Sequence, residues 1–479
     1  MKFNVHYDLS AIVKYGTALV LILALLKITK GFAAFLLPFL VVGPFANRKP
    51  TPVLFWVLFM TAALTGNSAV FSTNFFSLMA FRATLVLVSM LVIGKILAGR
   101  SATCLTPFLG LMIYILWECV VSVQGFDRVI SYLKLILFTM IFFSFYGVAN
   151  EVNLSSRINV RVLRSSILCV VMLMIVGSIA LIPFPGISYM SNEDMIEQML
   201  AGEVTSLFRG MCRHSQGMGP LAGILGTFVF ADLVFSIRKW DRLYLFILLC
   251  CPIVIYKTSS RTGMGTFLAG IMMVAFLLMH SRGLAQRWKG KVTSIMIFIG
   301  IVGVVATLFV PQIRDRITKY ALKWGGEEKG QELTMESMLT TRQKQIDTSK
   351  RNFKNKPFLG NGFQVSETMQ GMQRSGLLSY MSAPIEKGVW VYAVLEEGGV
   401  IGFVLFAGWV LYLMVALHKR KAYVTASTFF AMLMSNFGEF GFFSLTYTGG
   451  FYWAMVFAAT TLDVHRERML NFSPWARGI

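Results

Sequence analysis

Four arginines are candidates for binding an anion: Arg209, Arg213, Arg261 and Arg342. Arginine keeps its charge and offers a planar fork of hydrogen-bond donors. Arg261 follows Ser260 and opens an apolar run. A helix starting there would add its dipole and its free backbone N–H groups to the attraction for an anion, with Ser260 as its cap. The competing interpretations are a membrane-interface anchor for Arg261 and a solvated loop charge for Arg342.

A second set of ionisable residues falls inside apolar segments, where charge is costly and therefore points to function. Its members are Arg82, Glu118, Lys134, Asp232 and Glu439. On the topology derived below, all but Asp232 lie in the outer half of their segments, which predicts a polar cavity open to the outside. In the alternative, Arg82 and Lys134 extend to the outer interface and Glu118 pairs with one of them.

Other kinds of site chemistry have little support in the sequence. There is no Asp-x-Asp motif, no His/Cys cluster and no nucleotide-binding glycine loop. Five of the six cysteines lie in apolar segments, and only Cys212 lies in a loop, without an evident partner. We therefore expect no metal, no cofactor and no disulfide framework.

The elements that position these residues are membrane helices. Of the 479 residues, 56% are hydrophobic and 14% are charged, whereas about a quarter of a typical soluble chain is charged. Apolar stretches of the length that crosses a bilayer, about 20 residues, recur along the whole chain. The net charge of +21 is expected to reflect cytoplasmic anchoring rather than nucleic-acid binding.

The predicted fold is an all-α polytopic membrane protein with about 12–14 spans. The N-terminus lacks the features of a cleaved signal peptide, so the first span is expected to stay. The fourteen candidate spans are 9–28, 31–47, 52–71, 75–98, 104–124, 128–149, 162–184, 216–237, 241–257, 261–280, 292–312, 388–417, 421–441 and 443–463.

The short connections set the orientation, because Lys and Arg are retained in the cytoplasm. With both termini inside, the inner connections are basic from Arg48 and Lys49 onward, whereas those near 71–74 and 441–449 carry no Lys or Arg. The chain then divides into N-terminal helices (1–184), a first outer loop (185–215), central helices (216–312), a large outer loop (313–387), and C-terminal helices with a tail (388–479). The large loop carries 13 basic and 8 acidic residues, an excess that an anionic ligand would explain.

Several short motifs fall on the same outer side. They are Arg209-Gly210, Ser259-Ser260-Arg261-Thr262-Gly263, Thr341-Arg342, Pro357-Phe358-Leu359-Gly360-Asn361-Gly362-Phe363, and Leu395-Glu396-Glu397-Gly398-Gly399-Val400-Ile401-Gly402. In order and spacing, over roughly residues 205–402, they resemble the superfamily of O-antigen ligases and Wzy-type O-antigen and exopolysaccharide polymerases.

The resemblance implies an enzyme that moves a glycan from undecaprenyl diphosphate to an acceptor sugar at the periplasmic face. The resemblance makes Arg261 and Arg342 the principal predicted ligands of the diphosphate, which carries growing charge as it leaves, and Arg209 and Arg213 further candidates. Glu397 is expected to orient or cap a neighbour, and Arg82 and Ser260 to support the site. The four glycines Gly360, Gly362, Gly399 and Gly402 are expected to permit positive φ in the loop and close helix packing in the membrane.

The implied reaction is a metal-independent, inverting displacement, which needs a base for the acceptor hydroxyl. Family ligases offer a histidine before the Leu-x-Glu-x-Gly helix, but here the sequence reads Pro384-Ile385-Glu386-Lys387-Gly388. Glu386 and His214, the only histidine predicted to lie outside, are the candidate bases. A surface Glu–Lys pair and an ordinary loop histidine are the competing interpretations.

Polymerase is preferred to lipid A core ligase because that histidine is absent. From a different class, a transporter or flippase of lipid-linked sugars would also explain the helices and intramembrane charges, although no repeated halves are visible. The expected location is the bacterial inner membrane. Expected partners are the lipid-linked donor, a glycan or lipid-linked acceptor, membrane lipids, and a chain-length regulator or other assembly protein.

Overall fold

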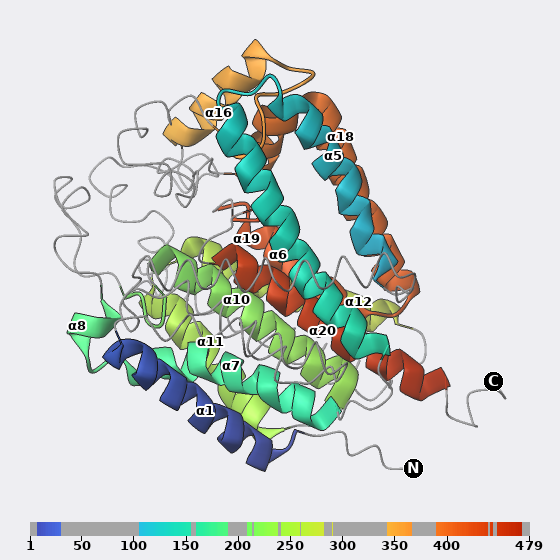
Figure 1. Ribbon diagram of the computed structural model, residues 1–479. Coiled ribbons are helices and arrows are strands. Elements are labelled where there is room, and N and C mark those ends of the chain that lie inside the picture. Colours follow the sequence, from blue (N-terminus) through green and yellow to red (C-terminus); the bar gives the residue numbers. More distant parts are fainter. Residues whose placement is uncertain are drawn as a thin grey trace, which may run out of the picture.

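The protein is a bundle of helices in the computed structural model (Figure 1). About 83% of what the structure describes is helical, without named strands in that part; the pair Tyr189 and Phe208 forms an isolated bridge. The structure describes residues 7–29, 105–154, 160–189, 208–212, 215–237, 241–258, 260–281, 290, 343–365, 389–438, 441–443 and 448–471.

The first half of the described chain supplies α1 (Leu9–Ile28), the 3-10 turn η2 (Thr106–Gly110), α5 (Leu111–Ser122), α6 (Arg128–Leu154), α7 (Val160–Ala180) and the short α8 (Pro185–Ser188). The second half supplies α10 (Ser215–Asp232), which continues as the π-helix η3 (Leu233–Ile237), then α11 (Arg242–Lys257), α12 (Arg261–His280), α16 (Gln343–Asn355), α18 (Trp390–Lys419), α19 (Tyr423–Ser435) and α20 (Thr448–Asn471).

Most of these bounds follow the predicted spans closely, but the prediction at 443–463 begins five residues before Thr448, where α20 begins, and ends eight residues before Asn471, where α20 ends. The prediction at 9–28 coincides with α1, that at 241–257 differs from α11 by one residue, and that at 261–280 coincides with α12. The prediction at 421–441 was too long, because α19 ends at Ser435. The spans predicted at 31–47, 52–71, 75–98 and 292–312 lie outside the described residues.

Five of the described helices are long and apolar enough to cross a membrane: Arg128–Asn150, Val160–Ala180, Gly217–Ile237, Arg261–His280 and Trp390–Lys419. Two shorter apolar helices, Thr106–Ser122 and Tyr423–Ser435, lie among them. The chain is therefore an all-α, multi-pass membrane protein, as its composition predicted.

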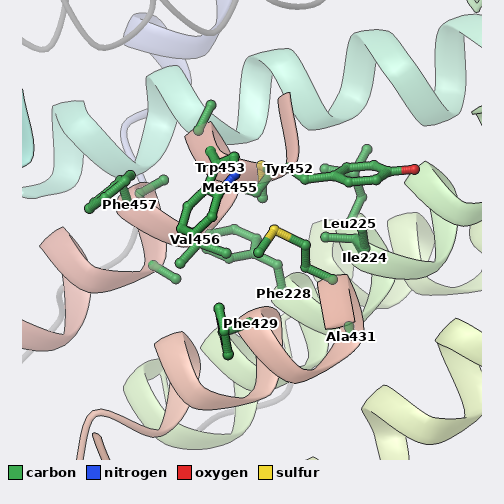
Figure 2. Packing of buried hydrophobic residues seen from close by; sticks show 14 of the residues in the cluster. Ile224, Leu225, Phe228, Phe429, Ala431, Tyr452, Trp453, Met455, Val456 and Phe457 are labelled. Atoms are coloured by element: carbon green, nitrogen blue, oxygen red, sulfur yellow. The ribbon is translucent and has the colours of Figure 1, made fainter. Parts of the chain in front are cut away.

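Helix α10 lies at the centre of the bundle, in contact with α7, α11, α12, α19 and α20. Figure 2 shows its contact with α19 and α20, where Phe228, Phe429 and Trp453 fill the space between the helices. The approach of α10 to α12 depends on small residues. A side chain on Gly263 would overlap the backbone of Gly219, so glycine lets these two helices pack backbone against backbone.

A buried ion pair joins three helices at one end of the bundle. Arg164 of α7 donates from Nε and Nη2 to the two carboxylate oxygens of Asp232 at 2.9 and 3.0 Å, and the Tyr244 hydroxyl donates to Asp232 at 2.6 Å. Arg164 and Asp232 are 4% and 0% exposed. The sequence singled out Asp232 as a membrane-depth charge and a functional candidate; in the structure Arg164 neutralises it within the helix packing.

Candidate functional site at one end of the bundle

Those predicted motifs that the structure describes gather at the end of the bundle opposite the Arg164–Asp232 pair, which we call the motif end. There α18 begins beside the end of α19, with the Trp390 amide donating to the Asn436 carbonyl at 3.0 Å. The start of α12 contacts the end of α19 through Thr262 and Gly438. Gly219 near the start of α10 contacts Ser260. These contacts place the first turns of α10, α12 and α18 on one side, as the predicted topology requires.

The segment Pro357–Phe363 docks directly on the motif in α18. The amides of Asn361 and Gly362 donate to the carbonyls of Glu396 and Glu397 at 2.9 and 3.0 Å, and the Val400 amide donates to the Pro357 carbonyl at 2.8 Å. Two motifs that the sequence placed only on the same side of the membrane are thus hydrogen-bonded to each other.

A break in α18 at Gly399 makes this docking possible. Gly399 has φ 67° and ψ −167°, a conformation that is essentially restricted to glycine. In an unbroken helix the Val400 amide would bond to the Glu396 carbonyl; here the docked loop satisfies both groups instead. The sequence assigned Gly399 to positive φ or helix packing in general, without locating this break.

Gly360 provides the complementary fit on the loop side. It has φ 78°, and a side chain there would overlap the carbonyl of Glu397. Gly362 also has positive φ, at 101°. Gly402 faces Trp117 of α5 at close range, and the Trp117 indole donates to the Gly398 carbonyl at 2.8 Å. These glycines therefore have the structural roles that the sequence predicted.

Helix α16 is attached to α18 through Glu396. The Ser349 hydroxyl and the Asn352 amide donate to the two carboxylate oxygens of Glu396 at 2.7 and 2.8 Å, and all three side chains are buried. The Asn361 amide group donates to the Asn352 carbonyl at 3.0 Å. Much of the loop predicted at 313–387 is outside the described residues, but its part from Gln343 to Asn355 is a helix fixed to the bundle.

Helices α5 and α6 hold the other side of the docked segment. The Ser131 hydroxyl donates to the Phe363 carbonyl at 3.0 Å, and the Lys134 ammonium donates to the Gln364 carbonyl at 3.2 Å. Lys134 is only 1% exposed. The alternative in which Lys134 extends to the outer interface is therefore wrong, since its side chain points inward to the loop backbone.

Two buried carboxylates lie near Tyr114, where α5 packs against the break in α18. Glu118 and Glu397 are both fully buried, and the Glu118 carboxylate lies against Gly398. Glu396 and Glu397, although adjacent, have different surroundings: Glu396 binds α16, whereas Glu397 lies at the α5 side near Glu118 and Tyr114. Glu118 and Lys134 lie at the same end of the bundle, whereas Arg82 and Glu439 lie outside the described residues, so the polar cavity open to the outside stays a prediction.

Two of the predicted arginines, Arg261 at a helix start and Arg209 in a loop, lie at the same end. The Ser260 hydroxyl accepts from the Gly263 amide at 3.0 Å and caps α12, as predicted, with Arg261 as the first residue of that helix. Arg209 is 9% exposed. Its guanidinium donates to the Ile187 carbonyl at 3.2 Å, and its amide donates to the Ser188 carbonyl at 2.7 Å. Arg209 thus ties the two ends of the first outer loop together.

Several predicted site residues fall outside the described residues: Arg82, Arg213, His214, Arg342, Glu386 and Glu439. Two of them adjoin described helices in the sequence, since α10 begins just after His214 and α16 just after Arg342. Among the residues the structure describes, no three His, Cys, Asp or Glu side chains come close enough together to hold a metal ion.

Sequence reasoning missed the residues that join the motifs to one another. Ser349 and Asn352 were read as ordinary loop residues, and Glu396 was passed over in favour of Glu397. A signal was present, because Ser349 and Asn352 are three residues apart and share a helix face with Ile346, which is also buried.

No family model matches the chain, and a search of curated proteins returns no match either. The fold class defined by its helices is that of a multi-pass, all-α membrane protein.

Proposed function

We propose that this protein transfers a glycan from an undecaprenyl-diphosphate carrier to an acceptor sugar, and that it polymerises the repeat units of a surface polysaccharide. The observation that carries the proposal is the docking of Pro357–Phe363 on the broken helix at Gly399. In the resembling superfamily, these are the loop and the helix that accompany the arginine motifs.

The chemistry is a displacement at the anomeric carbon of the donor sugar. The acceptor oxygen forms the new bond, the bond from that carbon to the diphosphate oxygen breaks, and a base takes the proton of the acceptor hydroxyl. Arg261 and Arg342, with Arg209 and Arg213, would bind the diphosphate and stabilise its charge as it leaves. Glu386 and His214 are the proposed alternatives for the base.

The position of Arg261 supports its proposed role. It opens a helix of 20 residues whose cap, Ser260, is in place, so the free N–H groups of the first turn and the helix dipole favour an anion beside it. The proposed site faces the periplasm from the inner membrane, with both chain termini in the cytoplasm.

The test uses purified protein and an undecaprenyl-diphosphate-linked oligosaccharide, without an energy source. Longer lipid-linked glycan is expected, and no lipid A core should be required. Product formed only when lipid A core is supplied would indicate a ligase instead. Movement of the donor across the bilayer without any new glycosidic bond would indicate a flippase and would contradict the transferase proposal.

A matched pair of arginines sharpens the test. Arg261 and Arg242 each begin a helix behind a side-chain cap, Ser260 and Asp241 respectively, but Arg242 lies at the end of the bundle opposite the motifs. Arg261→Ala should abolish transfer, whereas Arg242→Ala should retain it. Full activity in Arg261→Ala would refute the assignment. The base is identified by comparing the pH dependence of the rate in Glu386→Gln and His214→Ala, and full activity in both would refute both assignments.

A further inference from the structure

Helix α16 and the turn that follows it combine cationic and exposed apolar side chains. Ile346, Ser349 and Asn352 are buried against α18. The opposite side carries exposed Lys350, Arg351 and Lys354 with one acid, Asp347. In the turn, Phe358 and Leu359 are 67% and 41% exposed.

The turn lies at the motif end of the lipid-facing surface of α18. Helix α18 is the most apolar of the five spans that the described residues contain and has the smallest buried share, 28%. Its exposed apolar side chains run from Val400 to Val415, about 22 Å at the rise of an α-helix. The Val400 amide donates to the Pro357 carbonyl at 2.8 Å. Phe358 and Leu359 therefore stand level with the first lipid-facing residues of α18.

The cations lie farther toward the start of α18, at the depth expected of lipid headgroups. The Lys350 ammonium is 5.0 Å from the centre of the Tyr392 ring, eight residues or about 12 Å before Val400. Figure 1 shows α16 beside the upper ends of α5 and α18. An apolar tip at acyl depth with cations about two helical turns above it is the arrangement by which amphipathic segments bind the membrane interface.

We infer that α16 with the turn Pro357–Leu359 is a membrane-interface anchor, and that its partner is the anionic phospholipid of the bilayer around α18. Phe358 and Leu359 enter the acyl region, while Lys350 and Lys354 bind phosphate in the headgroups. Because Ser349 and Asn352 hold Glu396 from the other side of the helix, lipid binding reinforces the docking of the loop on α18. This inference does not depend on transferase activity.

The test is made with the full-length protein in phosphatidylcholine nanodiscs, with and without phosphatidylglycerol. Hydrogen exchange of the α16 amides should slow when phosphatidylglycerol is present. In Lys350→Gln/Lys354→Gln the protection should fall by roughly five-fold for each lysine removed. The control Arg242→Gln/Lys419→Gln changes two exposed cations at the opposite end of the bundle, and its α16 amides should respond to phosphatidylglycerol as in the wild type. The exchange of the α10 amides should be the same in every variant.

A second measurement reports on the turn. With p-benzoylphenylalanine in place of Phe358, irradiation should yield lipid adducts, as it should at the lipid-exposed Val404 position. Equal α16 exchange in both lipid mixtures would overturn the inference. So would adducts at position 358 to protein alone, which would indicate a partner chain. The same protection by inorganic phosphate in pure phosphatidylcholine would indicate a phosphate site instead of a lipid surface, and would also overturn it.

Discussion

Ser349 and Glu396, 47 residues apart in the sequence, are joined by a buried hydrogen bond of 2.7 Å from hydroxyl to carboxylate. Together with the bond from Asn352, it fixes an extramembrane helix to a membrane span. Hydrogen bonds to a buried carboxylate are stronger than those between neutral groups, and losing the acceptor leaves both donors unsatisfied.

Glu396→Ala should therefore release α16 without unfolding the bundle. We expect the opening of α16 to become more favourable by about 2–3 kcal/mol, or roughly a hundredfold, because two bonds to one carboxylate are lost. Hydrogen exchange of residues 343–355 measures this opening. Lys354→Ala, on the exposed side of the same helix, is the control and should exchange like the wild type in detergent. Unchanged exchange in Glu396→Ala would show that other contacts hold α16.

Gly399→Ala should disrupt the docking of the loop more severely than any other alanine substitution in α18. Its backbone conformation costs a residue with a side chain about 1–3 kcal/mol, and the new methyl group would also overlap the backbone of Phe358. Loss of folded protein, or rapid proteolysis near residue 358, is the expected result.

Gly408 is the matched control for that substitution, because it lies in the same helix with nothing within 4 Å of an added Cβ. Gly408→Ala should be neutral or stabilising by up to about 1 kcal/mol through helix propensity. Equal thermal stability of the two variants would contradict the role given to Gly399.

Asp232→Ala should destabilise the bundle by about 3–5 kcal/mol, since it leaves the Arg164 guanidinium buried without its counter-ion. The loss of stability is measured by heating the protein in detergent and recording by size-exclusion chromatography how much of it stays folded. Replacing both partners, as in Arg164→Met/Asp232→Leu, removes the uncompensated charge and should recover much of the stability. A single variant as stable as the wild type would show that the pair contributes little.

Cys212 should be almost inert to thiol reagents. Burial raises the pKa of the Cys212 thiol to about 12, so below that pH the unreactive protonated form predominates. Compared with an ordinary thiol of pKa about 8.5, its thiolate population at neutral pH is lower by roughly a thousandfold.

The measurement is the rate of maleimide labelling in a variant whose other five cysteines are replaced. Lys354→Cys in the same background provides an exposed comparison. Equal rates for the two thiols at neutral pH would show that the segment around Cys212 opens freely.

The sequence predicted the described membrane spans well because long apolar runs allow few other structures in a bilayer. The start of α12 followed from Ser260, whose side chain caps that helix, whereas the equivalent cap of α11 by Asp241 was not predicted. By contrast, α16 was read as loop, because its apolar content is low and its helical form is stabilised by contacts with α18.

The candidate site was predicted in part. Motif order and the charge rule placed the glycine segments at one end, and the described residues agree. The different contacts of Glu396 and Glu397 could not be predicted from the sequence, because they depend on the direction of each side chain next to the break at Gly399. That direction is set by Trp117 and by the loop backbone, and both are more than 30 residues away from Glu396 and Glu397 in the sequence.

The broken turn at Gly399 also has a consequence for biogenesis. Trp117, Phe358 and Gly399 meet at this point, but the ribosome synthesises them in that order, far apart in time. Helix α5 and the loop are both synthesised before α18, whose backbone bonds to the loop at Glu396, Glu397 and Val400 and accepts the Trp117 indole N–H at Gly398. The motif end therefore cannot close until α18 has entered the bilayer, and any arrest of synthesis before that helix should leave a chain that is inserted but incomplete.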